Sequence, residues 1–121
     1  MPQVKLLTPK EANQTLPLVK RVVDDILKAG QEIRSLSVNM EKPEEDPAID
    51  RLMDQLDELF EELESIGCSY KDWNFSIGLV DFPAVIRGRE VLLCWRSDEN
   101  EIKYYHDLEA GFDGRKLIPK E

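Results

Sequence analysis

The sequence predicts an α+β domain, in which an N-terminal antiparallel helical hairpin packs on a small C-terminal antiparallel β-meander of about three strands. Two observations carry this prediction. Apolar residues recur at the spacing of a helical face as far as Gly67, and beyond it they alternate with polar residues as they do in strands. With 121 residues the chain suffices for one hydrophobic core, so we expect a single domain, with the hairpin over about 8–67 and the sheet over about 68–121.

The first helix is predicted to begin at Pro9 and to run to about Met40. Thr8 and Glu11 have the spacing of a capping box, and a proline is tolerated at the first helical position. Pro17 lies inside the pattern, so we expect a kink there or a restart that divides the helix. The apolar face consists of Ala12, Leu16, Val19, Val22, Val23, Ile26, Ala29, Ile33 and Leu36.

The second helix is predicted to follow a charged connection at 41–47. Asp46 and Pro47 form a cap followed by a proline, and Gly67 supplies a left-handed end. The short connection favours an antiparallel hairpin. Its apolar stripe is Ile49, Leu52, Met53, Leu56, Leu59, Phe60, Leu63 and Ile66. This stripe has the pattern of ordinary core, but it is longer than a small sheet can cover, so part of it is also predicted to form a helical dimer seam.

Strands are predicted over 77–86, 89–96 and 102–107, the first two joined by a two-residue Arg-Gly turn. Counting outward from that turn places Asp81 opposite Cys94 on one face of the sheet. The other face, which the helices should cover, carries Val80, Phe82, Ala84, Val91, Leu93 and Trp95. Because a proline lacks an amide donor, we expect an open edge or a bulge near Pro83.

The place of His106, the one histidine of the chain, depends on the loop before the third strand. If that loop puts Tyr104 opposite Trp95, His106 joins the core face, which is the better amphipathic fit. If a bulge shifts the pairing by one residue, His106 lies opposite Cys94 on the other face. The sequence leaves both registers open.

In the second register, Asp81, Cys94 and His106 form a row across three strands. Their oxygen, sulfur and nitrogen atoms suit zinc or another divalent metal, with Glu99 or Glu101 as a fourth ligand. The same trio permits a nucleophile interpretation, with Cys94 as thiolate, His106 as base and Asp81 as the orienting carboxylate. The structural alternative is a hydrogen-bonded histidine and a cysteine that serves as a small hydrophobe.

A ligand site at this end of the sheet would also include Trp95, Arg96 and Arg115. The arginines offer positive charge to an anion in an otherwise acidic protein, or they pair with its carboxylates. The sequence has no phosphate loop, dinucleotide fingerprint or zinc-protease helix. We therefore assign no catalytic residue, and leave open whether the protein is an enzyme and whether it uses a metal cofactor.

The composition argues against two classes of partner. Asp and Glu number 25 against 16 Lys and Arg, and the formal charge of −9 repels nucleic acid and anionic membranes. The N-terminus has no secretory apolar region, so we expect a cytoplasmic protein. Cys68 and Cys94 have no metal-binding spacing of their own and are expected to be reduced there.

Several segments together resemble a known family. They are Thr8–Asn13 with Leu16–Pro17, Gly67–Cys68, Gly78–Pro83, Val91–Trp95, Glu101–His106 and Gly111–Arg115. With them the chain resembles, over nearly its whole length, the small prokaryotic family catalogued as domain of unknown function 2203. The resemblance implies a small bacterial protein and no particular activity.

Three functions follow as hypotheses. We favour a non-enzymatic, self-associating interaction module, a homo-oligomer and most simply a dimer, because of the long apolar stripes. The alternative is a metal- or small-molecule-binding protein, with or without enzymatic activity, that uses the Asp/Cys/His cluster. A cytoskeletal or division scaffold ranks last, because the chain lacks a basic membrane-binding segment and sustained heptads.

Overall fold

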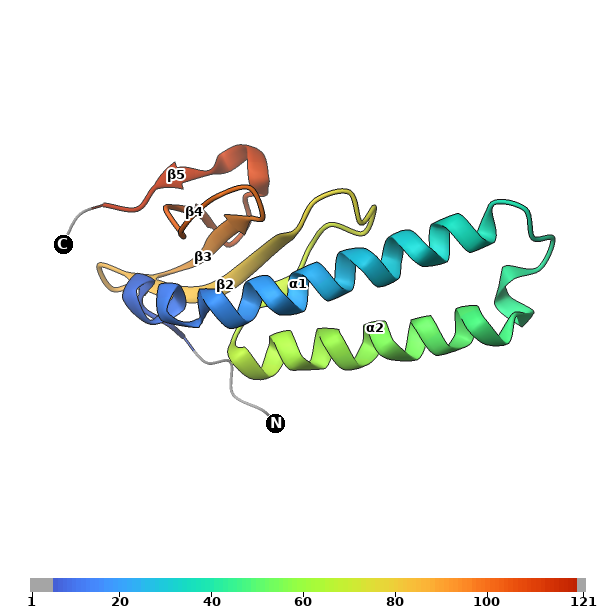
Figure 1. Ribbon diagram of the computed structural model, residues 1–121. Coiled ribbons are helices and arrows are strands. Elements are labelled where there is room, and N and C mark those ends of the chain that lie inside the picture. Colours follow the sequence, from blue (N-terminus) through green and yellow to red (C-terminus); the bar gives the residue numbers. More distant parts are fainter. Residues whose placement is uncertain (1–5, 120–121) are drawn as a thin grey trace.

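The computed structural model describes residues 6–119 and places two helices before one antiparallel sheet (Figure 1). The elements are α1 (Pro9–Ser37), the 3-10 turn η1 (Pro43–Glu45), α2 (Pro47–Ile66), β1 (Ser69–Tyr70), β2 (Leu79–Ile86), β3 (Arg89–Arg96), β4 (Tyr104–Asp107), the 3-10 turn η2 (Phe112–Gly114) and β5 (Lys116–Leu117). The strands pair in the order β1-β2-β3-β4-β5. The α+β class is confirmed, but the meander has five strands rather than about three, because β1 and β5 have two residues each and are too short to show alternation.

The start of α1 is as predicted, and its course and end are not. The Thr8 hydroxyl accepts from the Glu11 amide at 3.1 Å, and the Glu11 carboxylate accepts from the Thr8 amide at 3.0 Å. The helix continues through Pro17 as one element and ends at Ser37, three residues before the predicted Met40. Pro17 lies on the exposed side of α1, whereas its neighbour Leu16 is buried in the core, so the packed face holds the helix together across the missing hydrogen bond.

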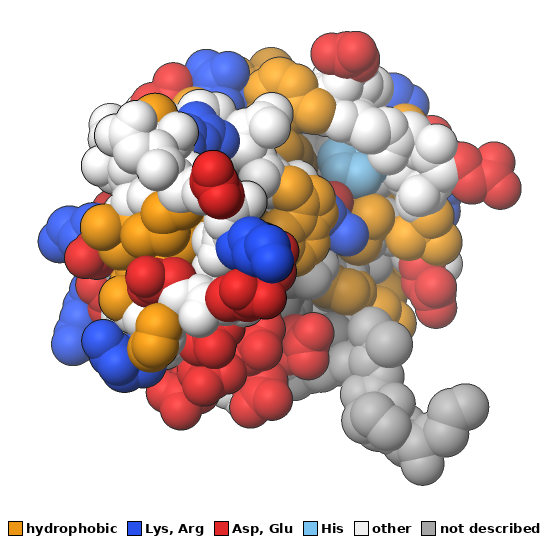
Figure 2. All heavy atoms as spheres, turned by 90° about the vertical axis from the view of Figure 1, so that its right-hand side faces the viewer, with side chains coloured by type: hydrophobic (Ala, Val, Ile, Leu, Met, Phe, Trp, Pro, Cys, Tyr) orange, Lys and Arg blue, Asp and Glu red, His pale blue; other side chains and the backbone are white. Residues whose placement is uncertain are grey.

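The α2 helix has both of its predicted ends. The Asp46 carboxylate accepts from the amides of Ala48 at 2.8 Å and Ile49 at 3.2 Å, and Gly67 ends the helix at φ 119°. The two helices form an antiparallel hairpin whose distal half extends beyond the sheet (Figure 1). Seven acidic residues and one arginine lie in α2, and acidic side chains gather over it in Figure 2.

The core lies between the hairpin and one face of the sheet, the inner face. The register of β2 and β3 is as predicted, with Val80 opposite Trp95 and Asp81 opposite Cys94. The turn uses Arg87 at φ 53° and Gly88 at φ 78°, the left-handed pair that a tight hairpin needs. All six predicted inner-face residues are at most 1% exposed, and they are Val80, Phe82, Ala84, Val91, Leu93 and Trp95.

The edge of β2 at Pro83 is covered by the chain before α1. The Leu7 amide donates to the Pro83 carbonyl at 2.9 Å, and the Leu7 carbonyl accepts from Val85 at 3.4 Å. These bonds flank Ala84 and use only the carbonyl of Pro83, so they require no donor from the proline. The predicted open edge is therefore closed by a single-residue parallel bridge from Leu7 to Ala84.

Strand β4 adopts neither of the predicted registers. Tyr104 lies opposite Cys94, and His106 lies opposite Leu92, so His106 is on the outer face of the sheet as the second alternative placed it, but displaced along the strand. The first alternative is wrong because regular alternation does not extend back to Ile102. That residue is 3% exposed in the core, and the strand begins only at Tyr104.

Neither helix in the described part of the chain combines the length and the apolar character that crossing a membrane requires.

Candidate metal-binding site

Three strands each contribute one buried polar side chain to the outer face of the sheet. Asp81 comes from β2, Cys94 from β3 and His106 from β4, and their exposed fractions are 6%, 1% and 3%. One ligand atom from each residue lies within 4.8 Å of the other two. The register that places His106 opposite Leu92 thus sets it diagonally to Cys94 and still within reach of Asp81.

The His106 ring is held in one orientation. Its Nδ1 lies 2.9 Å from the Asp107 carbonyl, which can only accept, so Nδ1 carries the proton and donates. Nε2 then faces Asp81, 3.3 Å from each carboxylate oxygen. The Asp107 side chain lies 3.1 Å from an Arg89 nitrogen and 3.7 Å from Lys116 Nζ, which anchors the residue that orients the ring. In metal-binding histidines one ring nitrogen typically donates to a backbone carbonyl or carboxylate and the other binds the ion; here Nε2, which faces Asp81, would be the ligand atom.

The spacing between His106 and Asp81 suits two ligands of one tetrahedral ion better than it suits a direct ion pair. Charge-assisted hydrogen bonds between nitrogen and a carboxylate are usually about 2.7–2.9 Å long, and Nε2 of His106 is farther from both oxygens of Asp81. Nitrogen and oxygen ligands of one tetrahedral zinc ion are about 3.3–3.5 Å apart. The sulfur of Cys94 needs a movement of roughly 1 Å to complete such a face.

Cys94 is a neutral thiol in the absence of a bound cation. Burial raises its pKa to about 12, and the negative charge of Asp81 adds to this effect. An activated thiolate requires nearby positive charge and partial exposure, which lower the pKa of the thiol. The burial of Cys94 and the charge of Asp81 raise it, so the nucleophile interpretation has no electrostatic support here. A divalent ion reverses the balance, because a coordinated thiol is deprotonated and the ion compensates both Asp81 and the thiolate.

Both cysteines are expected to resist alkylation while the protein is folded and free of metal. Burial raises the pKa of Cys68 to about 12 as well, from an ordinary value of 9.0 for both thiols. At pH 8 the folded protein should therefore react with iodoacetamide about a thousandfold more slowly than the chain in urea. Because the fold favours the neutral form of both thiols, they contribute to the free energy of unfolding. This contribution is complete below pH 9 and is lost as the pH rises toward 12. Mass spectrometry of timed samples measures the rates, and fast alkylation of Cys94 alone would instead support a reactive thiol.

A cavity of about 250 Å³ opens above the trio on the outer face. It is lined by Lys71, Leu79, Asp81, Leu92, Cys94, His106, Leu108, Ala110, Gly111 and Phe112. The segment between β4 and β5 forms its upper wall, on the side of the sheet away from the helices (Figure 1). Its lining combines the three polar side chains of the trio and Lys71 with the apolar side chains of Leu79, Leu92, Leu108 and Phe112.

Three other residues predicted for the site take different places. Trp95 is in the core on the inner face, where its indole nitrogen donates to the Glu99 carbonyl at 2.9 Å. Arg96 pairs with both oxygens of Asp98, at 2.7 and 2.9 Å, and borders a neighbouring cavity. Arg115 pairs with Glu99 rather than with Asp81.

Arg115 links the segment between β4 and β5 to β3, the strand that carries Cys94, by hydrogen bonds. It donates to the Glu99 carboxylate at 2.6 and 2.8 Å and to the Cys94 carbonyl at 3.1 Å. Its guanidinium lies between two rings, 4.1 Å from the centre of Tyr104 and 4.6 Å from that of Phe112. Arg115 is therefore a positioning residue, and Glu99 is already bound and does not join the trio as a fourth ligand.

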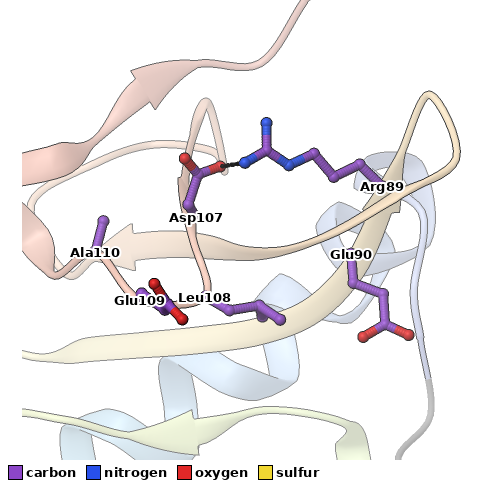
Figure 3. Close-up of a pocket in the computed structure, with 6 residues that line it drawn as sticks. All are labelled: Arg89, Glu90, Asp107, Leu108, Glu109 and Ala110. Atoms are coloured by element: carbon purple, nitrogen blue, oxygen red, sulfur yellow. Dashed lines mark ion pairs between the residues drawn. The ribbon is translucent and has the colours of Figure 1, made fainter.

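A second and larger cavity, of about 480 Å³, lies beside the first at the turn after β4 (Figure 3). It is lined by Arg89, Glu90, Asp107, Leu108, Glu109 and Ala110. Figure 3 shows Asp107 directed at Arg89, with the ion pair between them. None of the trio lines this cavity, so the clustered ligand atoms belong to the smaller one.

The sequence interpretation missed Lys71 and assigned no role at this site to Leu108 or Phe112. The Lys71 amide donates to the Leu79 carbonyl at 2.8 Å, which continues the pairing of β1 with β2 and puts both side chains on the outer face. Alternation with Ser69 could have suggested that face, but a two-residue strand gives no such signal. Leu108 and Phe112 lie outside the strands, where periodicity says nothing.

The comparisons with known proteins give one match. A family model described as Uncharacterized conserved protein (DUF2203) matches residues 5–118, which is nearly the whole chain. Searches of curated proteins and of solved structures found no significant match.

Proposed function

Because the chain belongs to the DUF2203 family of uncharacterized conserved proteins, whose description names no activity, we propose its function from the site itself. The protein binds one divalent metal ion, zinc in the first place, through Asp81, Cys94 and His106. The observation that carries this proposal is the convergence of three buried ligand atoms of different elements within 4.8 Å.

The chemistry of the three donors supports zinc over a hard cation. Thiolate sulfur and imidazole nitrogen are typical zinc ligands, whereas magnesium and calcium prefer sites made of oxygen. One thiolate and one carboxylate together carry two negative charges, so a divalent ion makes the buried group neutral overall. The ion would also separate Asp81 from Cys94, whose mutual effect raises the pKa of the thiol.

Native mass spectrometry of protein loaded with zinc and then desalted tests the proposal. We expect one zinc ion per wild-type chain. Cys94→Ala and His106→Ala should lower the zinc affinity by at least about a hundredfold, since each removes one of three ligands. The matched control is Cys68→Ala, because Cys68 is equally buried but lies in the core and donates its thiol to the Leu63 carbonyl.

Far-ultraviolet circular dichroism of each variant separates loss of the ion from loss of the fold. A wild-type chain that takes up no zinc contradicts the proposal. So does a folded Cys94→Ala variant that binds zinc as tightly as Cys68→Ala does. Asp81→Asn adds a third test, since it keeps the shape of the side chain and removes its charge.

Self-association is the second candidate function, and the shape of the hairpin favours it. The distal half of the hairpin extends beyond the sheet (Figure 1), and Leu36, Val38 and Met53 are exposed by 36%, 73% and 50%. Against it, much of the apolar stripe that suggested a dimer seam is occupied within the chain, where Leu56 is only 4% exposed. The same mass spectrum reports the oligomer number, and a monomer at micromolar concentration contradicts this candidate.

A further inference from the structure

We infer that the site binds a small carboxylate, one oxygen of which coordinates the metal while Lys71 meets its negative charge. This inference rests on the proposed metal site and adds the class of ligand that it takes. Its grounds are an open coordination position, the chemistry of the cavity walls and the surroundings of Lys71.

The trio supplies three protein ligands, and zinc usually takes four. Neither predicted fourth ligand belongs to the group of clustered ligand atoms. Glu99 bonds to Arg115, and Glu101 lies 3.8 Å from Lys103 at the surface. Structural zinc sites are closed by four side chains, whereas sites that bind a substrate keep one position open. The trio lines the cavity of about 250 Å³, so a fourth ligand from solution would reach a bound ion through it.

The walls of that cavity select a ligand with an apolar body and one polar end. Leu79, Leu92, Leu108 and Phe112 supply apolar surface beside the polar side chains of the trio. The volume accommodates a ligand of a few carbon atoms. Such walls disfavour a phosphate group, which needs several hydrogen-bond donors around it.

Lys71 is the one Lys or Arg among the residues that line this cavity, and its side chain is exposed at the rim rather than buried in an ion pair. Among the described residues it has no ion pair, and it lies on the same face as Asp81 and Leu79. The adjacent carboxylate, Asp72, is turned to its own loop, where it accepts from the amides of Asn74, Ser76 and Ile77 at 3.1, 3.1 and 2.8 Å. A lysine available in a hollow of a chain with net charge −9 favours an anionic ligand there.

A neighbouring hollow of about 330 Å³ shares part of the lining of this cavity. Both are bordered by Lys71, Leu79 and Phe112, and the second also has Arg96 at its rim. Arg96 is held by Asp98, so Lys71 remains the free cation between the two hollows in the described part of the chain. A branched or longer carboxylate can therefore extend into the second hollow while its oxygen reaches the metal.

Cobalt substitution provides the test, because tetrahedral Co²⁺ bound to a thiolate has visible and near-ultraviolet absorption bands that change with the fourth ligand. The probe is 3-methylbutanoate, with 3-methylbutanamide as its neutral isostere and inorganic phosphate as a second anion. We expect a saturable spectral change with the carboxylate and none with the amide or with phosphate. Lys71→Met should weaken carboxylate binding about tenfold, since it removes a charged contact and keeps the side-chain length.

The matched control is Lys28→Met, because Lys28 is an exposed lysine of α1, on the opposite side of the sheet. Each protein is first titrated with Co²⁺ alone. Absence of the cobalt bands at that stage overturns the metal site itself and with it the inference. Normal cobalt bands that do not respond to 3-methylbutanoate overturn only the inference, as does an equal response to phosphate. Equal carboxylate affinities in the two lysine variants overturn the role of Lys71.

Discussion

Replacing Trp95 by alanine is expected to lower the free energy of unfolding by about 3–5 kcal/mol. The side chain is 1% exposed on the inner face near the end of β3, and its indole nitrogen donates to the Glu99 carbonyl at 2.9 Å. The substitution leaves a cavity in the core and an unpaired carbonyl in the loop before β4. Since small domains are stable by only about 5–15 kcal/mol, this variant should be close to unfolding.

Urea denaturation followed by circular dichroism measures the change, and the second tryptophan is the matched control. Trp73 is 64% exposed and contacts Phe60 and Tyr70 edge to face, so Trp73→Ala should cost no more than about 1 kcal/mol. Similar losses in the two variants would contradict the placement of Trp95 in the core. The comparison also bears on the site, because a core residue should change stability without a direct effect on zinc.

The second large effect is expected from Gly78→Ala, which should cost about 1–3 kcal/mol by overpacking. A methyl group there would overlap Cγ1 of Val23 in α1 and lie 3.0 Å from Cβ of Ser97. The backbone cannot easily move aside, because Gly78 donates to the Ser97 hydroxyl at 3.0 Å and accepts from the Ser97 amide at 2.8 Å. Gly78 thus lies directly before β2, at a place where the backbone packs closely on α1.

A double-mutant cycle tests this mechanism by urea denaturation. Val23→Ala removes the methyl group that the new side chain meets, so the loss in the double variant should be clearly smaller than the sum of the two single losses. Gly111→Ala is the control, since a methyl group at Gly111 meets no atom within 4 Å and its φ of −100° suits alanine. Additive losses in the cycle would show that the cost of Gly78→Ala has another origin.

The two faces of the sheet explain how one small domain can hold both a core and a polar site. The inner face takes its apolar residues from the odd positions of β3, such as Leu93, and covers them with the hairpin. The outer face takes Cys94 from an even position, and the short segment between β4 and β5 lies over it. Adjacent residues in one strand therefore serve opposite purposes, Trp95 in the core and Cys94 at the proposed metal.

The sequence by itself determined the features that depend on neighbours along the chain. The capping box of Thr8 and Glu11, the caps of α2 at Asp46 and Gly67, and the tight turn at Gly88 follow from local chemistry, and each is present. That turn also fixed the pairing of Asp81 with Cys94, because counting outward from a two-residue turn leaves no freedom.

The place of His106 was decided only by the tertiary structure. The Asn13 side chain, in the first helix, accepts from the Ile102 amide at 2.8 Å and donates to the Ile102 carbonyl at 3.2 Å. These bonds draw Ile102 into the core and interrupt the alternation before β4, so His106 faces outward toward Asp81. Asn13 and Ile102 are 89 positions apart. No local sequence pattern predicts such a contact, because it forms only when the helix packs on the sheet.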